Sequence, residues 1–335
     1  MQARGLPPAT PRMQRRQPRA RDERSTQRAP HQRPGVRARV TPSLPAPLAV
    51  VCHDAGAAHL ILPWLDLWSG AVRACMAGPA QALWHARFGK QGLVLGLDAA
   101  LDGAAMLLSG TSLVAGLEHR ARIEAARVGL HSVAVVDHWI HYASRFQREG
   151  CRLLPDEIWV CDAEAFARAQ ATFPGQDIRL QPNTWLREQV ERVAPCPDPN
   201  RHQTVLLLPE PAGCDWGRGQ PGEEQAQDFL VEHALCLGLR KPLTLRLRPH
   251  DSDPPGRWDT WIARHAQRHD VSLDTSPTVV DALDSVAWVA GLESTALVMA
   301  QAASRRAVCL QPPWAPRARL PQRGLIHLRD LVPPG

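Results

Sequence analysis

The chain of 335 residues is longer than one ordinary domain core, so its length suits two domains of usual size. It is 44% hydrophobic and 21% charged, which is typical of globular proteins. Eleven arginines and two acidic residues lie among the first forty residues, an excess of nine positive charges within a net charge of +6. The remaining chain is therefore slightly acidic, which argues against a nucleic-acid partner.

The eight cysteines are scattered, without a C-x-x-C pair or a cysteine–histidine spacing suited to a metal. Cys52 and Cys309 lie inside apolar runs, as reduced core cysteines of cytosolic proteins do. No apolar stretch reaches the roughly eighteen residues that a membrane span needs, and no signal-peptide core follows the basic start. We therefore expect a cytoplasmic protein.

Residues 1–46 are rich in arginine, proline and glutamine and nearly free of large apolar side chains. This composition buries too little surface to offset the entropy cost of ordering, which predicts a disordered tail. Its positive charge suits weak peripheral contact with anionic lipid at the inner face of the membrane. The other interpretation is that the segment results from a start codon assigned too far upstream.

From Leu48 onward, apolar runs of about four to six residues alternate with helical stretches, which indicates βαβ units and mostly parallel sheets. The strands predicted in the first half are 48–52, 72–77, 92–96, 104–108, 132–136, 158–161 and 178–180. The helices predicted there are 57–68, 117–128, 163–172 and 185–194. The solvent-facing side chains expected on the second of these helices are Glu118, His119, Arg120, Arg122 and Glu124.

Three prolines within 195–202 predict a linker, after which the alternating pattern restarts. The strands predicted beyond it are 204–208, 243–247, 271–273, 286–290 and 307–310. The helices are 223–237, 258–268, 279–283 and one that begins at Ser294. We expect an α/β protein with Rossmann-like parallel-sheet domains over 47–195 and 203–330, which face a central cleft where the ligand binds.

A phosphate-binding turn is predicted after the strand 286–290. Gly291 permits a tight turn there, and Ser294 and Thr295 fall where the next helix begins. The first N–H groups of a helix lack partners and carry the positive end of the helix dipole, which suits phosphate. The alternative is an ordinary helix cap, because Ser and Thr are common at that position.

Arg248 and His250 follow the strand 243–247 and can add side-chain charge to the same phosphate. The carboxyl ends of parallel strands face the ligand cleft, which favours this interpretation. The alternative is a surface loop in which Asp251 and Asp253 balance the charge. Taken together, the turn and this loop predict a nucleotide or nucleotide-sugar site.

Two Rossmann-like halves with these motifs resemble the GT-B glycosyltransferases, and most closely the sialyltransferase-like and polysialyltransferase-like enzymes of bacterial surface polysaccharides. Those enzymes carry a His-Pro motif, a later Ser/Thr motif and an early acidic-acidic-Gly motif. Residues 293–295 (Glu-Ser-Thr) resemble the second motif, and residues 248–250 (Arg-Pro-His) resemble the first with its order reversed. Residues 53–56 (His-Asp-Ala-Gly) stand in place of the third with one acid.

The resemblance implies that the C-terminal half binds a nucleotide sugar and the N-terminal half binds the acceptor. The nucleotide-binding residues that it implies are Arg248, His250, Gly291, Glu293, Ser294 and Thr295. The loop after strand 204–208 often contacts the donor phosphates in such enzymes, but its Glu210 is expected to repel phosphate or to hold a hydroxyl or a cation. No Asp-x-Asp motif follows a strand, so we expect metal-independent chemistry with no cofactor besides the donor substrate.

Two places in the N-terminal half are candidates for the base that takes a proton from the acceptor. Asp54 follows the first strand, although it could instead cap the next helix. Asp137 and His138 follow the strand 132–136, and a His beside an Asp can act as an oriented base.

The candidates for contact with the acceptor are His53, Trp139, His141 and Tyr142. Trp139 offers a flat face for stacking on a sugar, and Tyr142 is the one tyrosine of the chain. The alternative for both aromatic side chains is ordinary packing in the core.

The sequence thus favours a glycosyltransferase that moves a sugar from a nucleotide donor to a glycan or lipid-linked acceptor. A nucleotide-sugar epimerase of the same fold and a non-catalytic binding or partner subunit are the alternatives. An epimerase differs in needing no acceptor.

Overall fold

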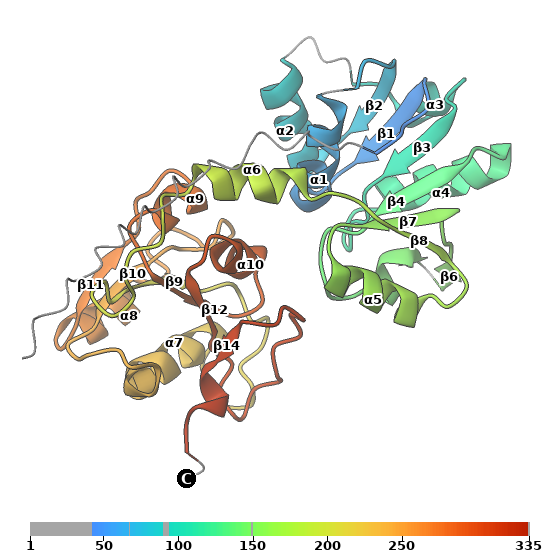
Figure 1. Ribbon diagram of the computed structural model, residues 1–335. Helices are drawn as coiled ribbons and strands as arrows, with labels where there is room; N and C mark the ends of the chain where they lie inside the picture. The colour runs from blue at the N-terminus through green and yellow to red at the C-terminus, as the bar shows by residue number, and fades with distance from the viewer. Residues whose placement is uncertain (1–41, 67, 90–93, 149, 334–335) are drawn as a thin grey trace, which may run out of the picture. The chain divides into compact units, whose positions relative to one another are not determined.

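The computed structural model describes residues 42–66, 68–89, 94–148 and 150–333 (Figure 1). Residues Val40–Gly335 form one compact unit that contains two six-stranded sheets. The predicted tail lies mostly outside the described residues, so its disorder stays a prediction. No helix of the described part is long and apolar enough to cross a membrane.

The first sheet is parallel throughout and has the order β2-β1-β3-β4-β7-β8. Its strands are β1 (Leu48–Cys52), β2 (Val72–Met76), β3 (Met106–Ser109), β4 (Ser132–Val135), β7 (Glu157–Val160) and β8 (Asp177–Leu180). The helices of this part are α1 (Ala55–Leu65), α2 (Gly78–Phe88), α3 (Leu97–Leu101), α4 (Leu117–Val128), α5 (Ala163–Thr172) and α6 (Thr184–Arg192). A short antiparallel hairpin, β5 (Gln147–Arg148) and β6 (Cys151–Arg152), follows β4.

The second sheet is also parallel and has the order β11-β10-β9-β12-β13-β14. Its strands are β9 (Thr204–Leu208), β10 (Thr244–Leu247), β11 (Asp270–Leu273), β12 (Trp288–Gly291), β13 (Arg306–Cys309) and β14 (Ile326–His327). Its helices are α7 (Gly222–His233), α8 (Asp259–Ala266), α9 (Val279–Leu283) and α10 (Thr295–Ala302).

Central strands of both sheets are buried on two faces, which explains their continuous apolar runs. Along β1, Leu48 and Val50 pack with α1 and α2, whereas Ala49 and Val51 pack with α3 and α4. Residues of β9 alternate in the same way between α9 and α10 on one side and α7 and α8 on the other. Alternate side chains of a strand point to opposite faces, so one apolar run supplies two cores.

Most of the predicted elements are present, and α4, α5, α9, β1 and β9 have the predicted bounds. The structure also contains α2, α3, β14 and the β5–β6 hairpin, which the sequence did not predict. Only Ala80 and Trp84 of α2 are buried, so this helix has almost no apolar periodicity to detect. Of the predicted strand 92–96, residues 92 and 93 lie outside the described part, and Val94 makes a single bridge to Ala74.

The prediction that α4 exposes its polar side chains is wrong for three of them. Glu118, His119 and Arg122 are buried, because this side of the helix packs against the polar ends of β1 and β3 rather than water.

Each sheet reverses its strand order at one point. In the first sheet the reversal lies between β1 and β3, and in the second between β9 and β12. Connections leave the two strands toward opposite faces at such a point, which opens a crevice beyond their carboxyl ends. Both places are therefore where a ligand is expected to bind.

Gly291 is the last residue of β12 and pairs with Leu208 of β9 and Cys309 of β13. It lies in the strand and not in the turn that the sequence predicted, and a Cβ at Gly291 would lie 2.8 Å from the carbonyl oxygen of Leu208. The glycine is needed for the close approach of two strands.

Replacing Gly291 by alanine should destabilise the protein by about 1–3 kcal/mol, because backbone must move to admit the methyl group. The control is Gly96→Ala at the start of α3, where a Cβ would meet nothing within 4 Å. Urea unfolding of both variants checks the prediction, and equal midpoints would contradict it.

Candidate functional site

A cavity of about 350 Å³ lies at the carboxyl ends of β9, β10 and β12, at the reversal point of the second sheet. Its wall includes Glu210 after β9, Arg248 and His250 after β10, and Ser294 and Thr295 at the start of α10. The cavity thus brings together four of the six residues predicted to bind a nucleotide. Gly291 and Glu293 are not part of this wall.

The start of α10 is open toward a ligand. Ser294 is the N-cap residue and has extended backbone angles, but its side chain makes no capping hydrogen bond. No acidic residue lies in the first turn of α10. The first turn of α10 therefore supplies no negative charge of its own to offset the positive end of the helix dipole, which favours an anion.

Arg248 contributes charge to the same wall. Its guanidinium donates to Asp274 Oδ2 (2.7 Å) and to the carbonyl oxygen of Ser276 (2.8 Å). Arg246 also pairs with Asp274, at 3.0 Å. One carboxylate is shared by two arginines, so this group keeps a net positive charge beside the cavity.

Glu210 lies opposite the start of α10. Its Oε1 accepts a hydrogen bond from the backbone N–H of Glu293 at 2.9 Å. Burial, helped by the negative charge of Glu293, raises the pKa of Glu210 to about 7, while the Glu293 N–H, the Ser294 hydroxyl and Arg319 act in the opposite direction. The expectation that Glu210 repels phosphate stays a prediction, although a carboxyl with this pKa is partly uncharged near neutral pH and repels an anion less.

Glu293 has a partner that the sequence did not indicate. Its carboxylate and the Arg319 guanidinium form a two-pronged ion pair, with Nη2 to Oε2 at 2.6 Å and Nε to Oε2 at 3.1 Å. Both side chains line a neighbouring cavity of about 440 Å³ together with Glu210 and Gln311. The Glu293 side chain is thus engaged away from the 350 Å³ cavity, although its backbone N–H helps to shape that cavity.

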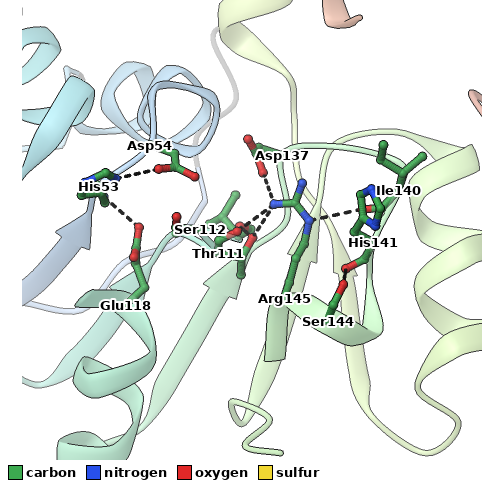
Figure 2. A network of polar contacts seen from close by, with 12 residues as sticks. His53, Asp54, Thr111, Ser112, Glu118, Asp137, Ile140, His141, Ser144 and Arg145 are labelled. Atoms are coloured by element: carbon green, nitrogen blue, oxygen red, sulfur yellow. Dashed lines mark hydrogen bonds and ion pairs between the residues drawn. The ribbon is translucent and has the colours of Figure 1, made fainter. Parts of the chain in front are cut away.

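The reversal point of the first sheet holds a second polar network, which Figure 2 shows. The imidazole Nδ1 of His53 lies 2.7 Å from Asp54 Oδ1, and the backbone N–H of His53 donates to Glu118 Oε1 at 2.8 Å. Asp54 is the N-cap residue of α1 but makes no side-chain capping bond. Its side chain is 39% exposed, so it is accessible to a substrate.

Three charged side chains in this part of the first sheet are buried: Glu118, Arg122 and Arg145. Burial raises the pKa of Glu118 and lowers that of Arg122 to about 10. Arg145 is buried as well and donates to Asp137 Oδ1 at 2.8 Å and to the carbonyl oxygen of Thr111 at 2.7 Å (Figure 2). A buried ion pair of this kind holds both side chains in defined positions, because loss of one partner would leave the other charge buried and unpaired.

Asp137 is therefore held in place by Arg145, and Gly56 makes room for it, because a Cβ at Gly56 would overlap the Asp137 carboxylate. Burial lowers the pKa of the neighbouring His138 imidazole, with Asp137 opposing the shift. A neutral imidazole at neutral pH is suited to accept a proton.

Trp139 and Tyr142 pack in the hydrophobic core, at 5% and 3% exposure. The Trp139 Nε1 donates to Asp162 at 2.6 Å, and the Tyr142 ring stacks against Phe173. This is the packing that the sequence left as the alternative, and it leaves Tyr142 almost no surface for an acceptor. His141 is exposed instead, and its carbonyl oxygen accepts from the Ser144 hydroxyl at 3.0 Å (Figure 2).

A further cavity of about 410 Å³ borders several of these residues. Asp137, His138 and Trp139 line it, as do His250 and Thr295. Neither His53 nor Asp54 belongs to its wall. The two candidate bases thus lie in different surroundings.

The sequence did not indicate four functional candidates: Glu118, Arg122, Arg145 and, as a carboxyl with a raised pKa, Glu210. The spacing of Glu118 and Arg122, four residues apart on one helix, is a common surface ion-pair pattern and gave no sign of burial. Both side chains are buried because α4 covers the carboxyl ends of β1 and β3, and the sequence does not show which strand ends a helix covers.

No protein-family model and no curated protein sequence matches this chain. The MnaA protein of S. aureus, solved in a co-structure with UDP, superposes with a TM-score of 0.52 at 12% identity, over 78% of this chain and 79% of that chain. A candidate UDP-N-acetylglucosamine 2-epimerase from Listeria monocytogenes gives a TM-score of 0.52 at 13% identity, over 78% of each chain. The prediction of two Rossmann-like parallel-sheet domains of the GT-B type is confirmed.

Glu210 should make stability depend on pH. A carboxyl whose pKa is raised on folding binds its proton more tightly in the folded chain, so stability falls as pH rises from about 4.5 to about 7. Glu210→Gln keeps the oxygen that accepts from Glu293 and removes this titration. Its free energy of unfolding relative to the wild type should rise over that pH range, on the order of 1–3 kcal/mol. Urea titrations at pH 5, 6, 7 and 8 check this, and parallel curves would refute it.

Proposed function

We propose that the protein is an enzyme that acts on a nucleotide sugar, whose phosphates bind in the 350 Å³ cavity. One observation carries the proposal: the uncapped start of α10 and the guanidinium of Arg248 border one cavity at the reversal point of the sheet. A phosphate there would accept from backbone N–H groups and from Arg248, while His250 stands on the same wall. The shared fold with a protein solved with UDP supports this choice of ligand.

Epimerisation is the first candidate reaction. The Listeria protein of the same fold carries that assignment, and the reaction uses the nucleotide sugar alone. Inverting a carbon centre needs groups that remove and return a proton. Asp137 and His138 suit such roles, because they border the 410 Å³ cavity that also reaches Thr295 and His250.

Glycosyl transfer to a glycan or lipid-linked acceptor is the second candidate. The observation in its favour is the exposed Asp54, which is oriented by His53 at the end of β1. A carboxylate in that position can take a proton from an acceptor hydroxyl. Neither reaction calls for a metal or another cofactor in this proposal.

The nucleotide site predicts a selective effect of two arginine variants. Arg248→Ala should weaken binding of UDP about 10- to 100-fold, because a charge-assisted hydrogen bond to phosphate is worth roughly 1.5–3 kcal/mol. Arg246→Ala removes an equal charge from the same carboxylate but does not line the cavity, so its affinity should stay close to that of the wild type. Calorimetry with UDP, CDP and CMP measures both.

Failure of all three nucleotides to bind the wild type would instead leave a non-catalytic binding or partner subunit. Equal losses of UDP affinity in both arginine variants would show that the phosphate does not bind in the 350 Å³ cavity.

The two candidate reactions differ in their need for an acceptor. With UDP-N-acetylglucosamine and no acceptor, we expect NMR spectra to show a second nucleotide sugar that differs at one carbon and approaches a fixed ratio. An unchanged spectrum that changes only after a glycan acceptor is added would favour transfer.

A further inference from the structure

Glu210 and Ser294 share an unusual feature. The Oε2 atom of Glu210 and the hydroxyl of Ser294 are both buried, and neither makes a hydrogen bond with any described residue. Both residues belong to the wall of the 350 Å³ cavity. Buried polar atoms in proteins almost always have partners, so two such atoms on one cavity wall indicate a polar ligand.

The hydrogen bonds around Glu210 determine which of its carboxyl oxygens can contact that ligand. Its Oε1 is occupied by the N–H of Glu293, so the free oxygen is Oε2. The Ser294 hydroxyl is close enough to lower the pKa of the carboxyl, yet it completes no hydrogen bond to it. A charged carboxylate here would repel a phosphate at the start of α10, whereas a carboxylic acid would donate to it.

Other charged groups face this carboxyl from the packed elements. Glu293 in the turn before α10 is paired with Arg319, and the buried Cys309 thiol of β13 lies nearby. Arg248, His250 and Asp251 share the cavity wall. Burial and Glu293 raise the pKa of Glu210 to about 7 without a ligand, and a bound anion raises it further, because like charges disfavour ionisation.

We propose that Glu210 is protonated in the nucleotide-bound protein and donates a hydrogen bond from Oε2 to a phosphate oxygen, so that each binding event takes up a proton. The inference rests on the proposed function, and it adds that the affinity of this site is controlled by pH. Binding weakens as pH rises above neutrality, because the proton must then be taken from a more alkaline solution.

The test is calorimetry of the full chain with UDP-N-acetylglucosamine at pH 8, in two buffers with different enthalpies of ionisation. This ligand lacks the phosphate monoester whose second ionisation falls near pH 6, so the ligand itself contributes no proton. We expect uptake close to one proton per nucleotide. Because about half of the unliganded carboxyl is still protonated at pH 7, the Kd should rise about 15-fold between pH 7 and 8.5, with a slope that approaches tenfold per pH unit only above pH 8.

Two variants identify the group that takes up the proton. Glu210→Gln should bind with no uptake and with a Kd that does not change with pH, whereas His250→Asn should retain the uptake. His250 is the necessary control because its imidazole, on the same wall, can also take up a proton. Asp251→Asn should change affinity equally at all pH values and leave the uptake intact.

Uptake that persists in Glu210→Gln and vanishes in His250→Asn would overturn the proposal. Binding by the wild type without proton uptake would overturn it too, whether or not the glutamine variant folds, and would leave the proposed function standing. Absence of binding at every pH would overturn both.

Discussion

The parallel pairing of β9 with β12 is the contact on which the candidate site depends. It places the loop that carries Glu210 beside the turn that leads into α10. The two strands meet closely because Gly291 has no side chain to separate them from the Leu208 carbonyl group. Sheet hydrogen bonds thus set the distance between a carboxyl group and a helix terminus that are more than eighty residues apart in the sequence.

Buried charge has a different purpose in each sheet. In the first sheet, Arg122 and Arg145 are held by carbonyl oxygens, hydroxyls and Asp137, which fixes the loops after β3 and β4. In the second sheet, Asp274 is shared by Arg246 and Arg248, and the excess positive charge is left at the cavity. Burial makes both arrangements costly unless every partner is present, which keeps the loops in defined positions.

Glu210 illustrates how environment decides chemistry. On a solvated loop it would be an anion that opposes phosphate binding. Desolvation beside Glu293 brings its pKa close to neutrality, and the same side chain can then donate a hydrogen bond. The chemical role of the residue follows from the strand ends and turns that enclose it.

The sequence by itself determined the fold class and most of the secondary structure. Apolar runs of the length of β1 and β9 identify doubly covered parallel strands, and the order of strands and helices implies two Rossmann-like halves. It also predicted that Ser294, Thr295, Arg248 and His250 lie near one another, because residues at the carboxyl ends of parallel strands face the same crevice, and all four line one cavity.

Only the tertiary structure decided which of the predicted site side chains remain free to contact a ligand. Arg319, twenty-six residues from Glu293, engages that carboxylate, and the first-sheet core takes up Tyr142. The burial of Glu118 and Arg122 and the raised pKa of Glu210 likewise depend on contacts between distant segments. The pKa of a group and its ion-pair partner are set by all the groups that surround it in space, and the sequence alone does not show which groups those are.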